Sequence, residues 1–180
     1  MNEISLAIRV LVALIFLTAA LGKFRHRLVF QGVVANYRLL PEIAVPAFAL
    51  GLPPVEVAVA AALLFVPSSW PAVCAAALLI LFALAMGINI QRGRRHIDCG
   101  CFQSALEQNL SWILVTRNAG LALLLAVPAT VPEGGLSPSG AAEALLTGTV
   151  LFVLLQSMNV LWSVAPAWRQ RHASPTGAKK

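Results

Sequence analysis

Charged side chains are scarce in this sequence. Only 11% of its 180 residues are Asp, Glu, Lys or Arg, whereas 59% are hydrophobic. A soluble domain of this length needs a much larger polar fraction to cover its surface. Because a helix that crosses a bilayer core of about 30 Å needs about 20 apolar residues, the long apolar tracts predict an all-α integral membrane protein.

Cysteine is also scarce, and the basic residues form no continuous stripe. Three cysteines in a chain of this length are too few for a disulfide framework. The net charge of +6 comes from Lys and Arg residues that mostly flank apolar tracts. Such residues are typical of topology signals and of contacts with lipid headgroups, so we expect the lipid bilayer, and no nucleic acid, as a partner.

The apolar tracts predict one helical-bundle domain over residues 1–168. Five spans are favoured over four, and they are expected at about 4–22, 43–66, 72–90, 110–127 and 144–164. A short interfacial helix is expected around residues 30–40. The basic tail, residues 169–180, is expected to be disordered.

Lys and Arg residues occupy alternate connections. They occur after the first span, after the third span and in the tail, whereas the other two connections contain none. The positive-inside rule then predicts a multi-pass membrane protein with the N-terminus outside and the C-terminus in the cytosol. The same rule places the connection of residues 91–109 on the cytosolic side.

That connection contains two cysteines separated by a single glycine, Cys99-Gly100-Cys101. Two cysteines so close can close a small, strained ring, and the glycine supplies the backbone freedom that closure requires. Strain favours the dithiol and makes the disulfide labile, which suits a catalytic couple better than a structural crosslink. Cys99 and Cys101 are therefore the candidate catalytic residues.

The residues around the pair favour the thiolate form. His96 and three arginines lie just upstream, and a capping box at 104–107 is predicted to open the fourth helix beside the pair. Asp98 opposes the effect electrostatically but could accept a proton. Cys74 stands alone in an apolar run, where we expect it to serve packing.

A soft-metal site is an alternative interpretation of the same residues. Cys99, Cys101 and His96 supply three ligands, whereas closed zinc sites take four. We therefore assign no metal, although a metal transporter remains an alternative function.

Several charged residues lie inside the predicted spans. Glu56 is in the second span, Arg117 and Asn118 are in the fourth, and Arg9 is in the first. Since isolated charges at this depth cost several kcal/mol, Glu56 is expected to pair with Arg117 or Arg9. Either a proton or quinone site or a structural ion pair would explain such a pairing.

Four short motifs, in this order and spacing, resemble the MauE family of DoxX-like membrane proteins. The resemblance covers about residues 5–127 and rests on Leu21-Gly22-Lys23-Phe24, Pro54-Val55-Glu56, Cys99-Gly100-Cys101-Phe102 and Arg117-Asn118. The family core is usually drawn with four spans, so the span at 144–164 is an extension.

The resemblance implies a redox-associated function. MauE proteins support maturation of the disulfide-rich small subunit of methylamine dehydrogenase, an exported protein, alongside the thioredoxin-like partner MauD. The resemblance therefore implies a redox-associated protein of the bacterial cytoplasmic membrane. Together with the Cys pair, it predicts a thiol–disulfide oxidoreductase that passes electrons to or from a thioredoxin-like protein or a quinone, the one candidate cofactor. A non-catalytic scaffold for a thioredoxin-like partner is the alternative. An exported client also conflicts with the cytosolic placement of the cysteines.

Overall fold

The computed structural model describes residues 2–94, 110–130 and 137–172, with side chains described as far as residue 161. All regular structure in these ranges is helical. Five helical stretches are long and apolar enough to cross a membrane: Glu3–Arg25, Glu42–Phe65, Trp70–Gln91, Trp112–Thr130 and Pro138–Leu161. The prediction of an all-α membrane bundle with five spans is confirmed.

Eight helical elements follow one another along the described part of the chain. They are α1 (Glu3–Arg25), α2 (Arg27–Tyr37), the 3-10 turn η1 (Glu42–Ala44), α3 (Val45–Phe65), α4 (Trp70–Gln91), α5 (Trp112–Leu124), α6 (Ala126–Thr130) and α7 (Pro138–His172).

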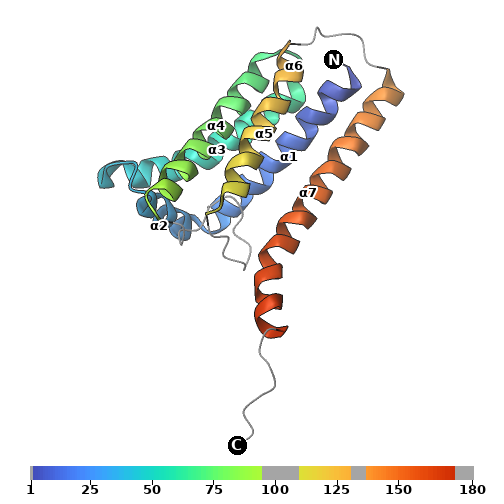
Figure 1. Ribbon diagram of the computed structural model, residues 1–180. Helices are drawn as coiled ribbons and strands as arrows, with labels where there is room; N and C mark the ends of the chain where they lie inside the picture. Colours follow the sequence, from blue (N-terminus) through green and yellow to red (C-terminus); the bar gives the residue numbers. More distant parts are fainter. Residues whose placement is uncertain (1, 95–109, 131–136, 173–180) are drawn as a thin grey trace, which may run out of the picture.

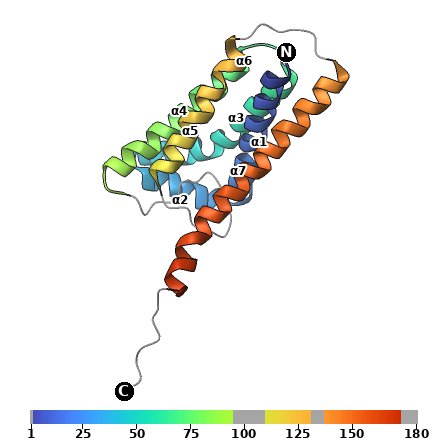
Figure 2. The ribbon, with the colours of Figure 1, turned by 45° about the vertical axis from the view of Figure 1, so that its right-hand side comes forward.

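Helix α1 is the centre of the bundle. It packs along both α3 and α7, while α4 packs along α5 (Figures 1 and 2). In the most apolar stretch of each helix, 67% of the α1 residues are buried, against 11% of those in α7. The core around α1 is made by aliphatic and aromatic side chains, such as Val12, Phe16, Leu63, Leu79 and Leu125. Helix α7 therefore lies at the edge and exposes most of its apolar surface.

The short helix α2 lies across one end of the bundle (Figure 1). Its buried face, which includes Phe30 and Val34, packs against Val45, Ala49 and Leu52 of α3. It ends at Tyr37, and the C-cap residue Arg38 that follows has a left-handed backbone with φ of 48°. The predicted short helix around residues 30–40 is confirmed, beginning and ending about three residues earlier.

The two ends of the bundle differ in their connections. At the end near α2, which we call the α2 end, α1 and α4 finish and α5 begins; the N-terminus, the α3–α4 connection and the start of α7 lie at the other end (Figure 1). The connections after the first and third spans thus share one end of the molecule, as alternating spans require.

The fourth span differs from the prediction at its start. Helix α5 begins at Trp112, with Ser111 as its N-cap, and Leu110 before it is not helical. Residues 104–107 lie outside the described residues, but the capping box cannot open a helix that starts at Trp112. The N-terminus of α5 therefore follows Cys101 by eleven residues in the sequence, and the Cys pair itself lies outside the described residues.

Helix α7 is longer than the fifth predicted span. It begins at Pro138 and continues to His172, four residues into the segment predicted as a tail. The backbone hydrogen-bond ladder propagates easily once formed, and Ala, Arg and Gln near its end are good helix formers.

Candidate functional site: a buried ion pair beside an apolar cavity

A lysine and a glutamate form an ion pair in the interior of the bundle. Lys23 lies in the last turn of α1 and Glu56 in the middle of α3. The Lys23 Nζ donates to both carboxylate oxygens of Glu56, at 2.6 Å and 2.8 Å. The two side chains are 5% and 0% exposed, so both ions are removed from solvent and from lipid. In such surroundings each charge depends on the other for its stability.

Two aromatic rings complete the surroundings of the Lys23 ammonium. The Nζ lies 5.4 Å from the ring centroid of Phe30 and 5.7 Å from that of Phe82. Both distances are within the range of cation–π attraction. An ammonium has three N–H donors, and the two oxygens of the Glu56 carboxylate engage two of them. Lys23 therefore retains donor capacity on the side of the rings.

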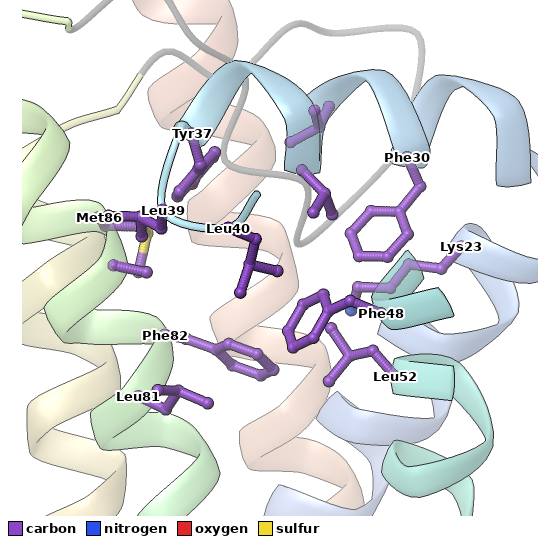
Figure 3. A pocket seen from close by; sticks show the side chains of 13 residues that line it. Lys23, Phe30, Tyr37, Leu39, Leu40, Phe48, Leu52, Leu81, Phe82 and Met86 are labelled. Carbon is purple, nitrogen blue, oxygen red and sulfur yellow. The ribbon is translucent and has the colours of Figure 1, made fainter. Parts of the chain in front are cut away.

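A cavity of about 190 Å³ adjoins the ion pair at the α2 end. It is bounded by α1, α2, α3 and α4, and its walls include Phe30, Phe48, Leu52, Leu81, Phe82 and Met86 (Figure 3). Among the described lining residues, only Lys23 and Tyr37 carry polar side chains. The cavity is thus an apolar chamber with a buried cation in its wall.

The partner of Glu56 differs from the residues considered in the sequence. Arg9 and Arg117 were the expected partners, because both were assigned to membrane spans, whereas Lys23 was counted with the polar connection. Helix α1 in fact continues to Arg25, which brings Lys23 into the bundle. The resemblance contained a usable signal, since Lys23 and Glu56 each belong to one of its motifs.

Arg9 of α1 bonds to the backbone that follows the C-terminal end of α3, away from the α2 end. Its guanidinium donates to the backbone oxygens of Val66 at 2.9 Å and Ser68 at 2.5 Å, and its side chain is fully buried. Carbonyls after the last turn of a helix lack intrahelical donors and carry the negative end of the helix dipole. Arg9 therefore acts as a C-terminal cap that holds α1 to α3.

Replacing Arg9 by Met should lower the free energy of unfolding by about 3 kcal/mol, because charge-assisted hydrogen bonds to two part-buried carbonyls are lost. Thermal or denaturant unfolding in detergent measures the change. Arg25→Met on the same helix is the matched control, since Arg25 is exposed and should show almost no effect. Equal stability of the two variants would contradict the capping role.

Arg117 links the fourth span to the fifth, whereas Asn118 bonds within its own helix. The Arg117 Nη1 donates to Asn159 Oδ1 at 3.1 Å and so links α5 to α7. The amide nitrogen of Asn118 donates to the backbone oxygen of Leu114 at 2.8 Å within α5, and the residue is buried. These contacts give Arg117 a role in helix packing across the bundle.

The predicted catalytic residues Cys99 and Cys101, with His96 and Asp98, lie outside the described residues. The two ends of their connection are described, and they meet. Ile90 of α4 and Leu110 before α5 belong to one apolar cluster, against which Tyr37 packs. Since Tyr37 also lines the cavity, the connection starts and finishes next to the cavity wall.

Cys74 does not have the role expected from the sequence. It lies near the start of α4, and its side chain is exposed rather than packed in the core. The apolar run around it faces outward on that side, as lipid-facing positions of a membrane helix do. An isolated cysteine in an apolar run does not reveal whether it faces protein or lipid.

The helices, the buried ion pair and the charged α2 end define a multi-pass α-helical membrane protein. Residues 1–131 match the family described as methylamine utilisation protein MauE. Since that match covers most of the sequence, the chain belongs to the MauE family. The suspected resemblance is confirmed.

Similar proteins match over most of their length. The chain is 45% identical over 167 residues to the methylamine utilization protein MauE of Paracoccus denitrificans, covering 89% of this chain and 88% of the relative. It is 44% identical to that of Paracoccus versutus, covering 96% and 92%, and 40% identical to that of Methylorubrum extorquens, covering 83% and 87%. No solved structure matches the chain.

Proposed function

We propose that this chain is a thiol–disulfide redox protein of the bacterial inner membrane that supports disulfide formation in an exported protein. Cys99 and Cys101 are the redox couple. The disulfide of the pair accepts two electrons and two protons from the dithiol of a thioredoxin-like partner, whose own disulfide forms in the same exchange. The names of the relatives favour a client in methylamine utilisation, and the methylamine dehydrogenase small subunit is the first candidate.

The observation that carries this proposal is the position of the Cys-Gly-Cys segment. It lies in the connection between α4 and α5, whose ends pack beside Tyr37 at the α2 end. This end also contains the buried Lys23–Glu56 pair and the apolar cavity. A redox-active pair there could exchange electrons with a carrier dissolved in the membrane as well as with a partner protein.

Replacing both Cys99 and Cys101 by Ser should abolish maturation of the client in cells. Active methylamine dehydrogenase and the disulfide content of its small subunit are the measurements. Cys74→Ser is the matched control and should mature the client normally, because Cys74 is exposed and distant in sequence from the pair. Normal maturation with the double variant would reject the redox proposal in favour of a non-catalytic scaffold.

A trapped intermediate would name the partner. In the Cys74→Ser background, replacing either Cys99 or Cys101 leaves one thiol that cannot resolve a mixed disulfide internally. One of the two single variants should accumulate a covalent complex with a thioredoxin-like protein, visible on a non-reducing gel and lost on reduction. A complex in neither variant would count against direct exchange with such a partner.

The orientation can be tested with the same background. The distribution of Lys and Arg favours a cytosolic α2 end and an N-terminus outside. Under that orientation, a thiol reagent that does not cross the membrane should label Cys99 and Cys101 only after the cells are permeabilised. Labelling in intact cells would place the pair on the exported side, as disulfide formation in the client requires. Labelling only after permeabilisation would favour import of reductant over disulfide formation.

A further inference from the structure

We infer that the cavity between α1, α2, α3 and α4 binds the ring of a membrane-soluble quinone. The inference deepens the proposed function and rests on it, because a quinone would be the oxidant that regenerates the Cys99–Cys101 disulfide. Three properties of the cavity support it: the volume, the route of access and the polar groups in the wall. All of the residues that line the cavity are described.

The volume fits one substituted six-membered ring. A protein cavity of about 150 Å³ with aliphatic and aromatic walls accommodates benzene and excludes water. The cavity here measures about 190 Å³, which leaves room for the small substituents of a quinone ring. It is too small for a whole phospholipid headgroup together with its glycerol.

The cavity is reached from the membrane side of the molecule. Three of its lining residues, Leu39, Phe48 and Leu81, are 38%, 37% and 49% exposed, and all three are apolar. Leu81 lies within the spanning part of α4, so its exposed surface faces the lipid. A ligand that enters past these side chains is one that dissolves in the bilayer and carries an apolar tail.

The polar groups in the wall suit a planar ring with two carbonyl acceptors. Lys23 approaches the cavity from α1, and Tyr37, the single tyrosine of the chain, approaches from the end of α2 (Figure 3). Lys23 has an N–H beyond the two that Glu56 engages, and Tyr37 brings a phenol hydroxyl to the cavity wall. The rings of Phe30, Phe48 and Phe82 supply surfaces for stacking.

The Lys23 ammonium in the wall favours a quinone over an acyl chain as the ligand, because an acyl chain has no group that would interact with a cation. Reduction of a quinone places negative charge on its carbonyl oxygens, and a neighbouring ammonium stabilises that charge in a low-dielectric site. In the overall step, the Cys99–Cys101 dithiol gives two electrons and two protons to the quinone. The products are the disulfide and the quinol, so atoms and charge balance.

Binding of decylubiquinone to the purified full-length protein tests the inference. The protein carries Cys99→Ser and Cys101→Ser, is reconstituted in lipid nanodiscs, and binding is followed by quenching of tryptophan fluorescence. Ala85→Phe, which fills the cavity from α4, should weaken binding at least tenfold. Ala77→Phe is the matched control, because Ala77 lies on the same helix, is exposed and does not line the cavity.

Tyr37→Phe provides a second arm that leaves the cavity volume almost unchanged. Loss of one neutral hydrogen bond of about 1 kcal/mol should weaken binding about fivefold. Decanol, which has the tail without the ring, should compete poorly. The inference fails if Ala85→Phe and Ala77→Phe bind equally, or if decanol displaces the quinone at equal concentration, which would assign the cavity to an acyl chain.

These outcomes separate the inference from the proposed function. The binding measurement uses protein without Cys99 and Cys101, so it does not depend on thiol chemistry. Absent quinone binding with intact Cys-dependent maturation would remove the quinone and retain the redox pair. Quinone binding together with maturation that survives the loss of both cysteines would retain the quinone site and reject the redox role of the pair.

Discussion

Replacing Lys23 by Met, or Glu56 by Leu, should lower the free energy of unfolding by about 3–5 kcal/mol. Each change removes both short hydrogen bonds of the pair and leaves the other ion buried. Breaking a buried ion pair from one side costs this much because the surviving charge is not resolvated. Unfolding in detergent by heat or denaturant measures the loss.

The double variant, Lys23→Met with Glu56→Leu, should recover most of the lost stability. It replaces two ions by apolar side chains in a region that Phe30 and Phe82 already make apolar. A coupling energy of about 3 kcal/mol or more between the two sites is expected from the double-mutant cycle. Strictly additive losses would show that the pair is not an energetic unit.

The same double variant separates a structural role of the pair from a functional one. If the pair only holds α1 to α3, the stable double variant should mature the client normally. If the Lys23 ammonium also serves the cavity, the protein should remain folded while decylubiquinone binding and client maturation fall. Stability and function are therefore measured on the same preparation.

Replacing Gly148 by Leu should detach α7 from α1. A Cβ at Gly148 would lie 2.6 Å from the backbone oxygen of Ala7 and 2.8 Å from the Cβ of Val10, so the backbone of α7 lies directly against α1 at this point. Small residues permit such close packing between membrane helices, where dispersion contacts supply much of the association energy. Even Gly148→Ala should cost about 1–3 kcal/mol, because a backbone atom cannot move aside.

Gly140 supplies the matched control on the same helix. A Cβ there would meet the carboxylate of Glu3 at 2.5 Å, but that group is the end of a flexible side chain and can rotate away. Gly140→Ala should therefore be nearly neutral. Unfolding and a cysteine crosslink between α1 and α7 report the two effects, and equal behaviour of the two alanine variants would contradict the close approach.

Much of the architecture could be predicted because a bilayer restricts the choices. The five spans and the short helix α2 follow from the lengths of the apolar tracts and the polar segments between them. The exact helix ends could not be predicted in the same way. Helix α5 begins at Trp112 rather than at the capping box, and α1 extends past Gly22 to include Lys23.

The candidate site was only partly visible in the sequence. Glu56 could be recognised as a buried charge that needs a partner, since an intramembrane carboxylate is rare and costly. Its partner could not be recognised, because Lys23 is 33 residues earlier and was assigned to the connection after the first span. The partner of Arg9 could not be recognised either. Only the tertiary structure shows that Arg9 bonds to the backbone of Val66 and Ser68 after α3 and not to Glu56 as a salt bridge.

The sequence by itself determined the class of this protein, the number of its spans and the location of its Cys-Gly-Cys pair between two of them. Composition and spacing suffice for these features, because a membrane helix must satisfy its backbone locally and must match the thickness of the bilayer. The tertiary structure decided which charges meet and where the apolar cavity lies. Those features depend on the rotation and contact of helices that are distant in sequence, which hydropathy does not encode.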